Sequence, residues 1–328
     1  MILRIIFVFA FVISSITGHA QEAQVKVRHV ILISFDGLRS DAIKVLGPEK
    51  AETFNQMIKE GVSTLNARTD YDYTVTLPNH TCMITGYPVK GPQGHHLTEN
   101  ILVNKTIHDF AGRHVYSIFD SLHKNNYSSA MLASKLKFNI YKHSFPIDFV
   151  SLTDQDDLKT LHVFQKLIRD GLPNFVFMHF SGADHMGHQK GWSVDLNSSY
   201  MKEVQILNGY LESVLKEINS NTGLKDSTVI IVTTDHGGEG LGHSDNKKPL
   251  DYTIPFIIWG KAVAKGADLY RINRDRRQDP SDKRITYSEK SQPIRNGDAA
   301  NLALSLLGLP PVEGSTIGYQ KPLKINED

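Results

Sequence analysis

The stretch "STVIIVTTDHGGEGLGH", residues 227–243, runs from a strongly apolar segment into acidic, imidazole and glycine residues. Its first eight residues are apolar on both alternating faces, which is typical of a parallel strand covered by helices on both sides. Asp235 and His236 follow at the point where such a strand would end. Ligands of open α/β sheets gather at that edge, so the stretch indicates both a fold class and the place of a site.

Segments of the same two kinds alternate along the rest of the chain. Short apolar runs predict strands, and longer runs with apolar residues at helical spacing predict helices. The predicted strands are residues 29–35, 128–134, 174–180, 227–234 and 253–260, and the predicted helices are residues 52–62, 109–127, 156–171, 198–219 and 298–308. This alternation predicts an α/β fold with a mainly parallel central sheet, helices on both faces and loop insertions around the site.

Composition excludes some classes of partner and of site. The 328-residue chain has 36 Lys and Arg against 35 Asp and Glu, a formal net charge of +1. Such a balance gives no bulk attraction to nucleic acid, so we expect no nucleic acid polymer as a partner. Cys82 is the only cysteine, which excludes an internal disulfide and a cysteine-based zinc site.

The N-terminal segment "MILRIIFVFAFVISSITGHA" has the features of a secretory signal. A positive residue, Arg4, precedes an apolar run, and the segment ends with Gly18 and Ala20 at the spacing that a signal peptidase recognises. We expect residues 1–20 to be removed during export to the periplasm or medium, leaving residues 21–328 as a single catalytic domain. The alternative is a retained N-terminal anchor, although the 12-residue apolar run is short for a membrane span. No later run is long enough, so we expect no stable membrane insertion.

Three predicted strand ends carry an aspartate. Asp36 follows the first strand, Asp184 follows residues 174–180, and Asp235 follows residues 227–234. A single aspartate at a strand end is more often a turn or cap residue than a ligand. Three at one sheet edge, two of them accompanied by histidine, instead indicate a metal site.

Histidines complete this pattern. Asp184 and His188 are four residues apart, which on a helical turn puts both side chains on one face; His185 points elsewhere and is interpreted as structural. Four glycines between His236 and His243 can fold the chain back, so that His243 reaches the site. Carboxylate and imidazole ligands without thiolate favour Zn²⁺, with Mn²⁺ or Fe²⁺ as weaker alternatives.

The hydroxyl group of Thr76 is a further candidate for the site. Thr76 precedes Leu77 and Pro78, and because proline is tolerated only in the first turn of a helix, Thr76 is predicted at a helix N-terminus. Backbone N–H groups and the helix dipole there favour anions such as phosphate. Thr76 could alternatively be a simple N-cap, but a neighbouring metal ion would favour a reactive hydroxyl.

Five motifs, "FDGLRSD", "TLPNHTCMITG", "HHLTEN", "ADHMGH" and "TTDHGGEGLGH", occur in this order. Together they resemble the alkaline phosphatase superfamily, in particular its type I phosphodiesterase/nucleotide pyrophosphatase branch, over about residues 28–320. The resemblance implies a phosphohydrolase with two zinc ions that acts on a small phosphorylated substrate through a phospho-threonine intermediate.

The resemblance also implies a role for each residue. One zinc would be held by Asp36, Thr76, Asp235 and His236, and the other by Asp184, His188 and His243. Thr76 would be the nucleophile, and Asn100 would bind a non-bridging phosphoryl oxygen. Lys135 and Lys137, in "ASKLKF", match substrate-contacting basic residues of some phosphatase and phosphonate-hydrolase relatives. Alternatively, these lysines belong to an exposed polar turn.

The sequence permits alternatives for the substrate, for the class of protein and for the role of one basic segment. The lysines favour a phosphate monoester or a phosphonate as substrate, whereas the motifs favour a phosphodiester or pyrophosphate. A non-catalytic exported zinc-binding protein is the alternative of a different class, although structural zinc sites are closed and usually contain thiolates. The basic, polar segment 270–298 is interpreted as a solvated surface excursion rather than as a rim that attracts an anionic substrate.

Overall fold

The computed structural model describes residues 26–327 of the chain. The predicted signal segment therefore lies outside the described residues. Within them, no helix combines the length and the apolar composition that crossing a membrane requires.

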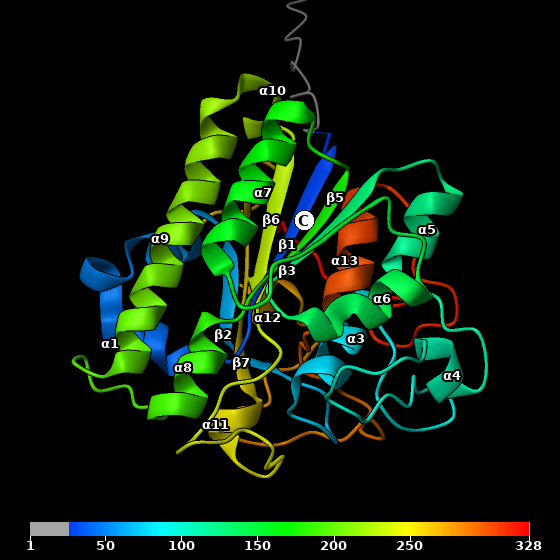
Figure 1. The fold of residues 1–328 in the computed structure, drawn as a ribbon, viewed down its shortest axis with the longest axis horizontal. Coiled ribbons are helices and arrows are strands. Elements are labelled where there is room, and N and C mark those ends of the chain that lie inside the picture. Colours follow the sequence, from blue (N-terminus) through cyan, green and yellow to red (C-terminus); the bar gives the residue numbers. More distant parts are fainter. Residues whose placement is uncertain (1–25, 328) are drawn as a thin grey trace, which may run out of the picture.

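One central sheet organises the fold (Figure 1). Its strands, in chain order, are β1 (His29–Phe35), β2 (Val62–Arg68), β3 (Ser129–Ala133), β4 (Phe149–Leu152), β5 (Phe175–Phe180), β6 (Thr228–Thr233), β7 (Thr253–Gly260) and β8 (Ala267–Asp268). In space the order is β4-β3-β5-β1-β6-β7-β2-β8. Strand β7 is antiparallel to both of its neighbours, and all the other pairs are parallel. The predicted α/β fold with a mainly parallel sheet is confirmed.

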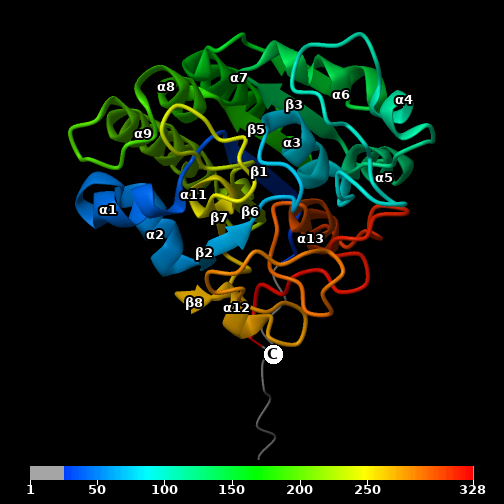
Figure 2. The ribbon, with the colours of Figure 1, turned by 90° about the horizontal axis from the view of Figure 1, so that it is seen from below.

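Helices pack on both faces of this sheet (Figures 1 and 2). One face is covered by α1 (Ser40–Lys50), α2 (Glu52–Glu60), α7 (Asp157–Asp170) and α9 (Ser199–Ser220). The other face is covered by α3 (Thr76–Thr85), α5 (Ile118–Lys124), α6 (Asn139–Ser144) and α13 (Asp298–Leu306). The shorter elements are α4 (Ile107–Ala111), the 3₁₀ helix η1 (Leu136–Phe138), α8 (Gly182–Lys190), α10 (Thr222–Lys225), α11 (Pro249–Tyr252) and α12 (Leu269–Ile272).

The central strands are apolar on both sides because each side faces a helical layer. In β1, Val30 and Leu32 pack into the layer that contains α3 and α13. The alternate residues Ile31 and Ile33 pack into the layer that contains α1 and α9. All four side chains are fully buried. The two cores fix the sheet and thereby the positions of its strand ends.

Some boundaries differ from the prediction for local reasons. The helix predicted over residues 109–127 is two helices, because Gly112 ends α4 in a left-handed conformation (φ 64°) and Ser117 starts α5 with a capping box. The helix predicted over residues 52–62 ends at Glu60, and Val62 already belongs to β2. Strands β2, β4 and β8 were not predicted, because β2 has polar residues at several positions and the other two are only four and two residues long.

The basic segment 270–298 is not simply a solvated excursion. Some of its residues are exposed, but its second half packs against the loop that precedes Thr76. The Tyr287 hydroxyl donates to the Asp70 carboxylate (2.8 Å), and Arg295 donates to the carbonyl of Thr69 (2.8 Å). Arg295 is 2% exposed. The positive charge of Arg295 therefore stabilises the fold and does not form part of an open basic rim.

Candidate active site

The three aspartates of the sequence pattern meet at one edge of the sheet. Strands β5, β1 and β6 are neighbours, and Figure 2 looks onto the edge where they end, between α3, α8 and α11. The backbone N–H of Asp36 donates to the carbonyl of Phe180 (2.9 Å), and the N–H of Asp184 donates to the carbonyl of Asp36 (2.9 Å). These bonds join the ends of β1 and β5, so the carboxylates are held by backbone rather than by flexible loops.

The first group of candidate ligands comprises Asp36, Asp235 and His236. Nε2 of His236 lies 3.4 Å from Oδ1 of Asp36 and 3.1 Å from Oδ2 of Asp235. All three side chains are fully buried. Their potential ligand atoms lie close enough together to hold one metal ion.

The second group comprises Asp184, His188 and His243. Oδ1 of Asp184 lies 3.4 Å from Nε2 of His188 and 3.6 Å from Nε2 of His243, and the two histidine nitrogens are 3.2 Å apart. Asp184 and His243 are buried, whereas the side chain of His188 is 48% exposed. Oδ1 of Asp184 is also 3.9 Å from Nε2 of His236, so the two groups adjoin.

The three histidines are oriented in the same way. In each, Nδ1 donates a hydrogen bond to a backbone carbonyl. The pairs are His188 with Leu241 (3.2 Å), His236 with Gly237 (2.8 Å) and His243 with Thr74 (2.6 Å). In a neutral imidazole this arrangement leaves the Nε2 lone pair free, and all three Nε2 atoms face the carboxylates. The imidazoles are therefore prepared to act as ligands.

Four buried atoms in these groups have no hydrogen-bond partner among the described residues: Asp36 Oδ1, Asp184 Oδ1, Asp235 Oδ2 and His236 Nε2. Leaving such atoms unpaired is costly. Burial and the charge of Asp36 raise the pKa of Asp235 well above its ordinary range, and burial lowers the pKa of His236 to about 3. Crowded carboxylates and neutral imidazoles are the ligands that divalent cations select. The residues present therefore fit a pair of metal ions.

Two further histidines lie beside Asp36, and sequence analysis missed them. His179 donates from Nε2 to Oδ2 of Asp36 (2.9 Å). His80 donates from Nδ1 to the carbonyl of Thr76 (2.9 Å) and accepts from the hydroxyl of Ser34 (2.7 Å). Although these histidines and Asp36 could geometrically hold an ion, their nitrogens are engaged, so we interpret them as supports. The spacing of four between Thr76 and His80 could have signalled one of them.

Thr76 is the first residue of α3, as its position before a proline predicted, and it is 1% exposed. Beside it, Oδ1 of Asn100 accepts from the backbone N–H of Leu77 (3.0 Å) and from Nζ of Lys137 (2.9 Å). The amide NH₂ of Asn100 therefore stays available to a ligand. Because Leu77 is engaged and Pro78 has no N–H, this helix end offers fewer free donors to an anion than the sequence suggested.

The two lysines of "ASKLKF" have different surroundings. The Lys135 ammonium lies 2.6 Å from Oδ2 of Asp36 and 2.6 Å from Oδ2 of Asp184. Burial opposes its charge, but these carboxylates raise the pKa of Lys135 above its ordinary value. Burial, and then the charge of Lys135, lower the pKa of Lys137 to about 8. Neither lysine belongs to a simple exposed turn.

Trp192 fixes the relative position of the two loops that carry the histidines. Its ring lies against Gly187 of α8 and Gly238 of the loop after β6, where an added Cβ would be 2.2 Å and 2.4 Å from ring atoms. Its indole N–H donates to the carbonyl of Gly37 (3.0 Å). Of the four glycines in this loop, only Gly240 has a positive φ (62°). The loop thus needs glycine mainly for close approach, and only once for its backbone conformation.

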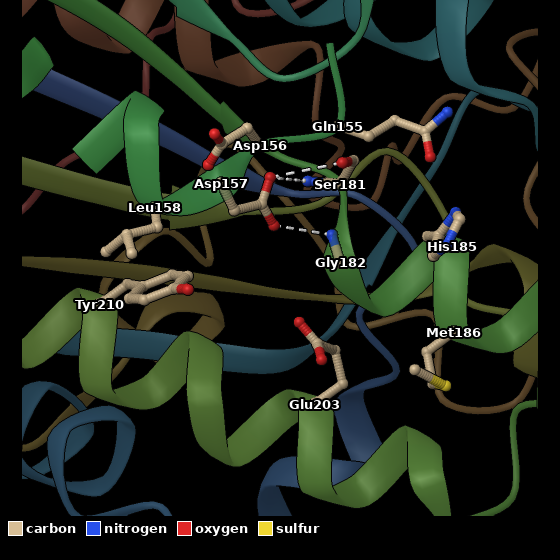
Figure 3. Close-up of a pocket in the computed structure, with 10 residues that line it drawn as sticks. All are labelled: Gln155, Asp156, Asp157, Leu158, Ser181, Gly182, His185, Met186, Glu203 and Tyr210. Atoms are coloured by element: carbon tan, nitrogen blue, oxygen red, sulfur yellow. Dashed lines mark hydrogen bonds between the residues drawn. The ribbon is translucent and has the colours of Figure 1, made fainter. Parts of the chain in front are cut away.

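The start of α8 is held by Asp157, at the beginning of α7 (Figure 3). Its carboxylate accepts from the backbone N–H groups of Ser181 (2.8 Å) and Gly182 (2.8 Å). A cavity of about 320 Å³ lies on this side of α8, and His185 lines it. His185 is exposed and belongs to neither ligand group, and its interpretation as structural stays a prediction.

Comparison with known proteins shows the family of this chain. The family model of type I phosphodiesterase/nucleotide pyrophosphatase matches residues 30–305, and the chain belongs to this family. The family places it among phosphoester hydrolases.

Solved structures at low identity share the fold. Murine ectonucleotide pyrophosphatase/phosphodiesterase 5, an inactive form in complex with AMP, has a TM-score of 0.63 at 14% identity, covering 92% of this chain and 97% of that one. An alkaline phosphatase superfamily protein of Vibrio parahaemolyticus has 0.60 at 16%, covering 92% and 72%. The C-terminal periplasmic domain of EptC from Escherichia coli, in complex with Zn, has 0.59 at 14%, covering 89% and 85%.

The contact of Gly238 with Trp192 gives a stability prediction. Gly238→Ala would force a methyl group into the indole ring, so we expect the free energy of unfolding to fall by about 1–3 kcal/mol. Gly242→Ala is the matched control in the same loop, because an added Cβ there meets nothing within 4 Å, and it should change stability by less than about 0.5 kcal/mol. Urea denaturation measures both, and equal effects would contradict the role of Trp192.

The separate ligand groups predict separable metal affinities. His243→Ala removes one nitrogen from the group with Asp184 and His188, and should weaken one bound metal ion by at least about tenfold. The second ion, with Asp36, Asp235 and His236, should keep its affinity within about threefold. Titration against a chelator resolves the two steps. Loss of both ions, or of neither, would contradict the division into two groups.

Proposed function

We propose that this protein is an exported phosphohydrolase that uses two zinc ions and cleaves phosphate esters through a phospho-threonine at Thr76. One observation carries the proposal: imidazole nitrogens and unpaired carboxylate oxygens converge in two groups, one of which is contacted by the helix that Thr76 begins. His80, one turn along that helix, lies 3.5 Å from Oδ2 of Asp235. We further propose cleavage after Ala20 and one catalytic domain over residues 21–328.

The ligand sets proposed are those implied by the sequence motifs. One zinc is assigned to Asp36, Thr76, Asp235 and His236, and the other to Asp184, His188 and His243. When bound, the ions supply positive charge that makes coordinated oxygens acidic and stabilises charge developing on the phosphoryl group. Zinc is preferred to manganese or iron because the ligands combine imidazole with carboxylate.

The residues of the chain supply the remaining parts of the reaction. The Thr76 hydroxyl forms a bond to phosphorus as the bond to the ester oxygen breaks, and the alcohol or phosphate leaves. The Asn100 amide donates to a non-bridging oxygen, and Lys137 adds positive charge next to it. Water then cleaves the phospho-threonine, which releases phosphate or a phosphomonoester and restores Thr76. The proton of the Thr76 hydroxyl passes to solvent or to the leaving oxygen, and the attacking water must enter from solvent. The side chain of His188 is 48% exposed, so the second ligand group lies at the surface, where water can enter.

The exposure of His188 argues against a purely structural metal site. Structural zinc sites are closed by four protein ligands, whereas the second ligand group has three, and His188 is about half exposed. A non-catalytic zinc-binding protein therefore fits these side chains less well than an enzyme.

Apolar side chains beside the polar ones bear on the substrate. Ile101, next to Asn100, is 65% exposed, Leu136 is 44% exposed, and Leu241, in the loop of His243, is 64% exposed. Such side chains favour a second, apolar ester group, and hence a phosphodiester or pyrophosphate. Lys137 favours a second class of substrate, a phosphomonoester or phosphonate, because its positive charge would pair with a dianionic group.

The nucleophile assignment has a direct test. Thr76→Ala should fold and bind metal but lose turnover of a phosphate ester by at least about a thousandfold, because the reacting oxygen is gone. Thr76→Ser keeps a hydroxyl group and should retain far more activity than the alanine variant. Steady-state kinetics on purified protein measures both. Turnover of Thr76→Ala within about tenfold of wild type would exclude Thr76 as the nucleophile.

The substrate question is tested at Lys137. Its charge is present below about pH 8 and lost as the pH rises through that value. If Lys137 binds the dianion, KM for p-nitrophenyl phosphate should rise above about pH 8 in wild type, and Lys137→Arg, which stays charged, should abolish that rise. KM for bis-p-nitrophenyl phosphate should change less. A pH profile that is the same in both proteins would remove Lys137 from substrate binding.

A further inference from the structure

Lys135 contacts one aspartate from each ligand group. Its ammonium lies 2.6 Å from Oδ2 of Asp36 and 2.6 Å from Oδ2 of Asp184. The other oxygen of each carboxylate, Oδ1, has no hydrogen-bond partner among residues 26–327 and lies towards the histidine nitrogens. Each carboxylate is thus divided, with one oxygen used by Lys135 and the other left for a metal ion.

The surroundings hold Lys135 in this position. It lies at the end of β3, directly before η1, and its side chain is only 15% exposed. The neighbouring Ser134 N–H donates to the carbonyl of His179 (3.3 Å), which ties the end of β3 to β5. His179 in turn donates to the same Oδ2 of Asp36 (2.9 Å). The Oδ2 atom therefore has two donors, and the carboxylate cannot rotate without breaking both hydrogen bonds.

Lys137, two residues further on, has different contacts, which suit a lysine that binds substrate. Its ammonium contacts the amide oxygen of Asn100 (2.9 Å) and none of the candidate metal ligands. The Lys135 ammonium instead donates to two carboxylates, one from each candidate ligand group. The two lysines thus belong to different parts of the site, although the sequence places them together.

We propose that Lys135 is a positioning residue, a permanent third cation that holds Asp36 and Asp184 so that their Oδ1 atoms face the two metal ions at a fixed separation. This inference rests on the proposed two-metal phosphohydrolase. It assigns Lys135 a role through the ligands rather than on the substrate. Three buried carboxylates at one sheet edge repel each other, and an ammonium between two of them offsets that repulsion without using a metal-facing oxygen.

Metal content tests the proposal independently of activity. Lys135→Ala removes the ammonium from between Oδ2 of Asp36, which keeps its hydrogen bond from His179, and Oδ2 of Asp184. A Mg²⁺ ion, which prefers oxygen ligands, can then take the place of the ammonium between these two oxygens. In buffer with zinc and magnesium, this variant should hold three divalent ions per chain. Wild type and the matched control Lys137→Ala should hold two. A Lys135→Ala protein with two ions would overturn the role of Lys135 as the third cation of the site.

Kinetics separate positioning from substrate contact. A positioning role predicts that kcat of Lys135→Ala without magnesium falls by at least about tenfold while KM stays within about threefold, and that magnesium restores much of kcat. A rise in KM at unchanged kcat would instead assign Lys135 to substrate binding and overturn the inference.

A second variant covers the case in which alanine disturbs folding. Lys135→Met fills a similar volume without charge, and cobalt-loaded protein reports the separation of the two ions through their magnetic coupling. The coupling should weaken or spread relative to wild type and Lys137→Met, and an unchanged coupling would overturn the proposal. Wild-type protein that binds two ions and hydrolyses phosphate esters supports the proposed function whatever the Lys135 variants do, so the two failures are distinguishable.

Discussion

Three buried carboxylates at one edge of the sheet are the constraint on which the rest of the structure depends. Asp36, Asp184 and Asp235 follow the neighbouring strands β1, β5 and β6, and all are almost inaccessible to water. One lysine, Lys135, neutralises only part of this charge. Buried charges persist in folded proteins when they are paired or bind metal ions. The unpaired oxygens of these carboxylates, together with the imidazole nitrogens beside them, give the edge the composition of a cation-binding site.

The surrounding elements serve this edge in separate ways. The two apolar cores hold the strands, so that the carboxylates cannot move apart. Asp157 fixes the first turn of α8, and Trp192 packs α8 against the glycines of the loop after β6. Backbone carbonyls select one tautomer of each ligand histidine. Packing and backbone hydrogen bonds therefore orient the candidate ligand side chains without the help of an ion.

Much of this site could be predicted from the sequence because parallel strands end at a common edge. Asp36, Asp184 and Asp235 followed strong apolar runs, and the spacing of four between Asp184 and His188 fixed a shared helical face. His243 could reach the site only if the loop folded back, and the loop does bring it close to Asp184 and His188. The roles of His179 and of Lys135 could not be predicted, because contacts between distant strands leave no local pattern. The purpose of Gly238 was also hidden, since it depends on a tryptophan 46 residues earlier in the chain.

The central claim is that two metal ions lie in two specific groups of ligands. Diffraction from crystals of zinc-loaded protein, recorded on both sides of the zinc absorption edge, tests it most directly. The account predicts two anomalous peaks, one within reach of Asp36, Asp235 and His236, the other within reach of Asp184, His188 and His243. A single peak, or zinc bound at other residues, would contradict it.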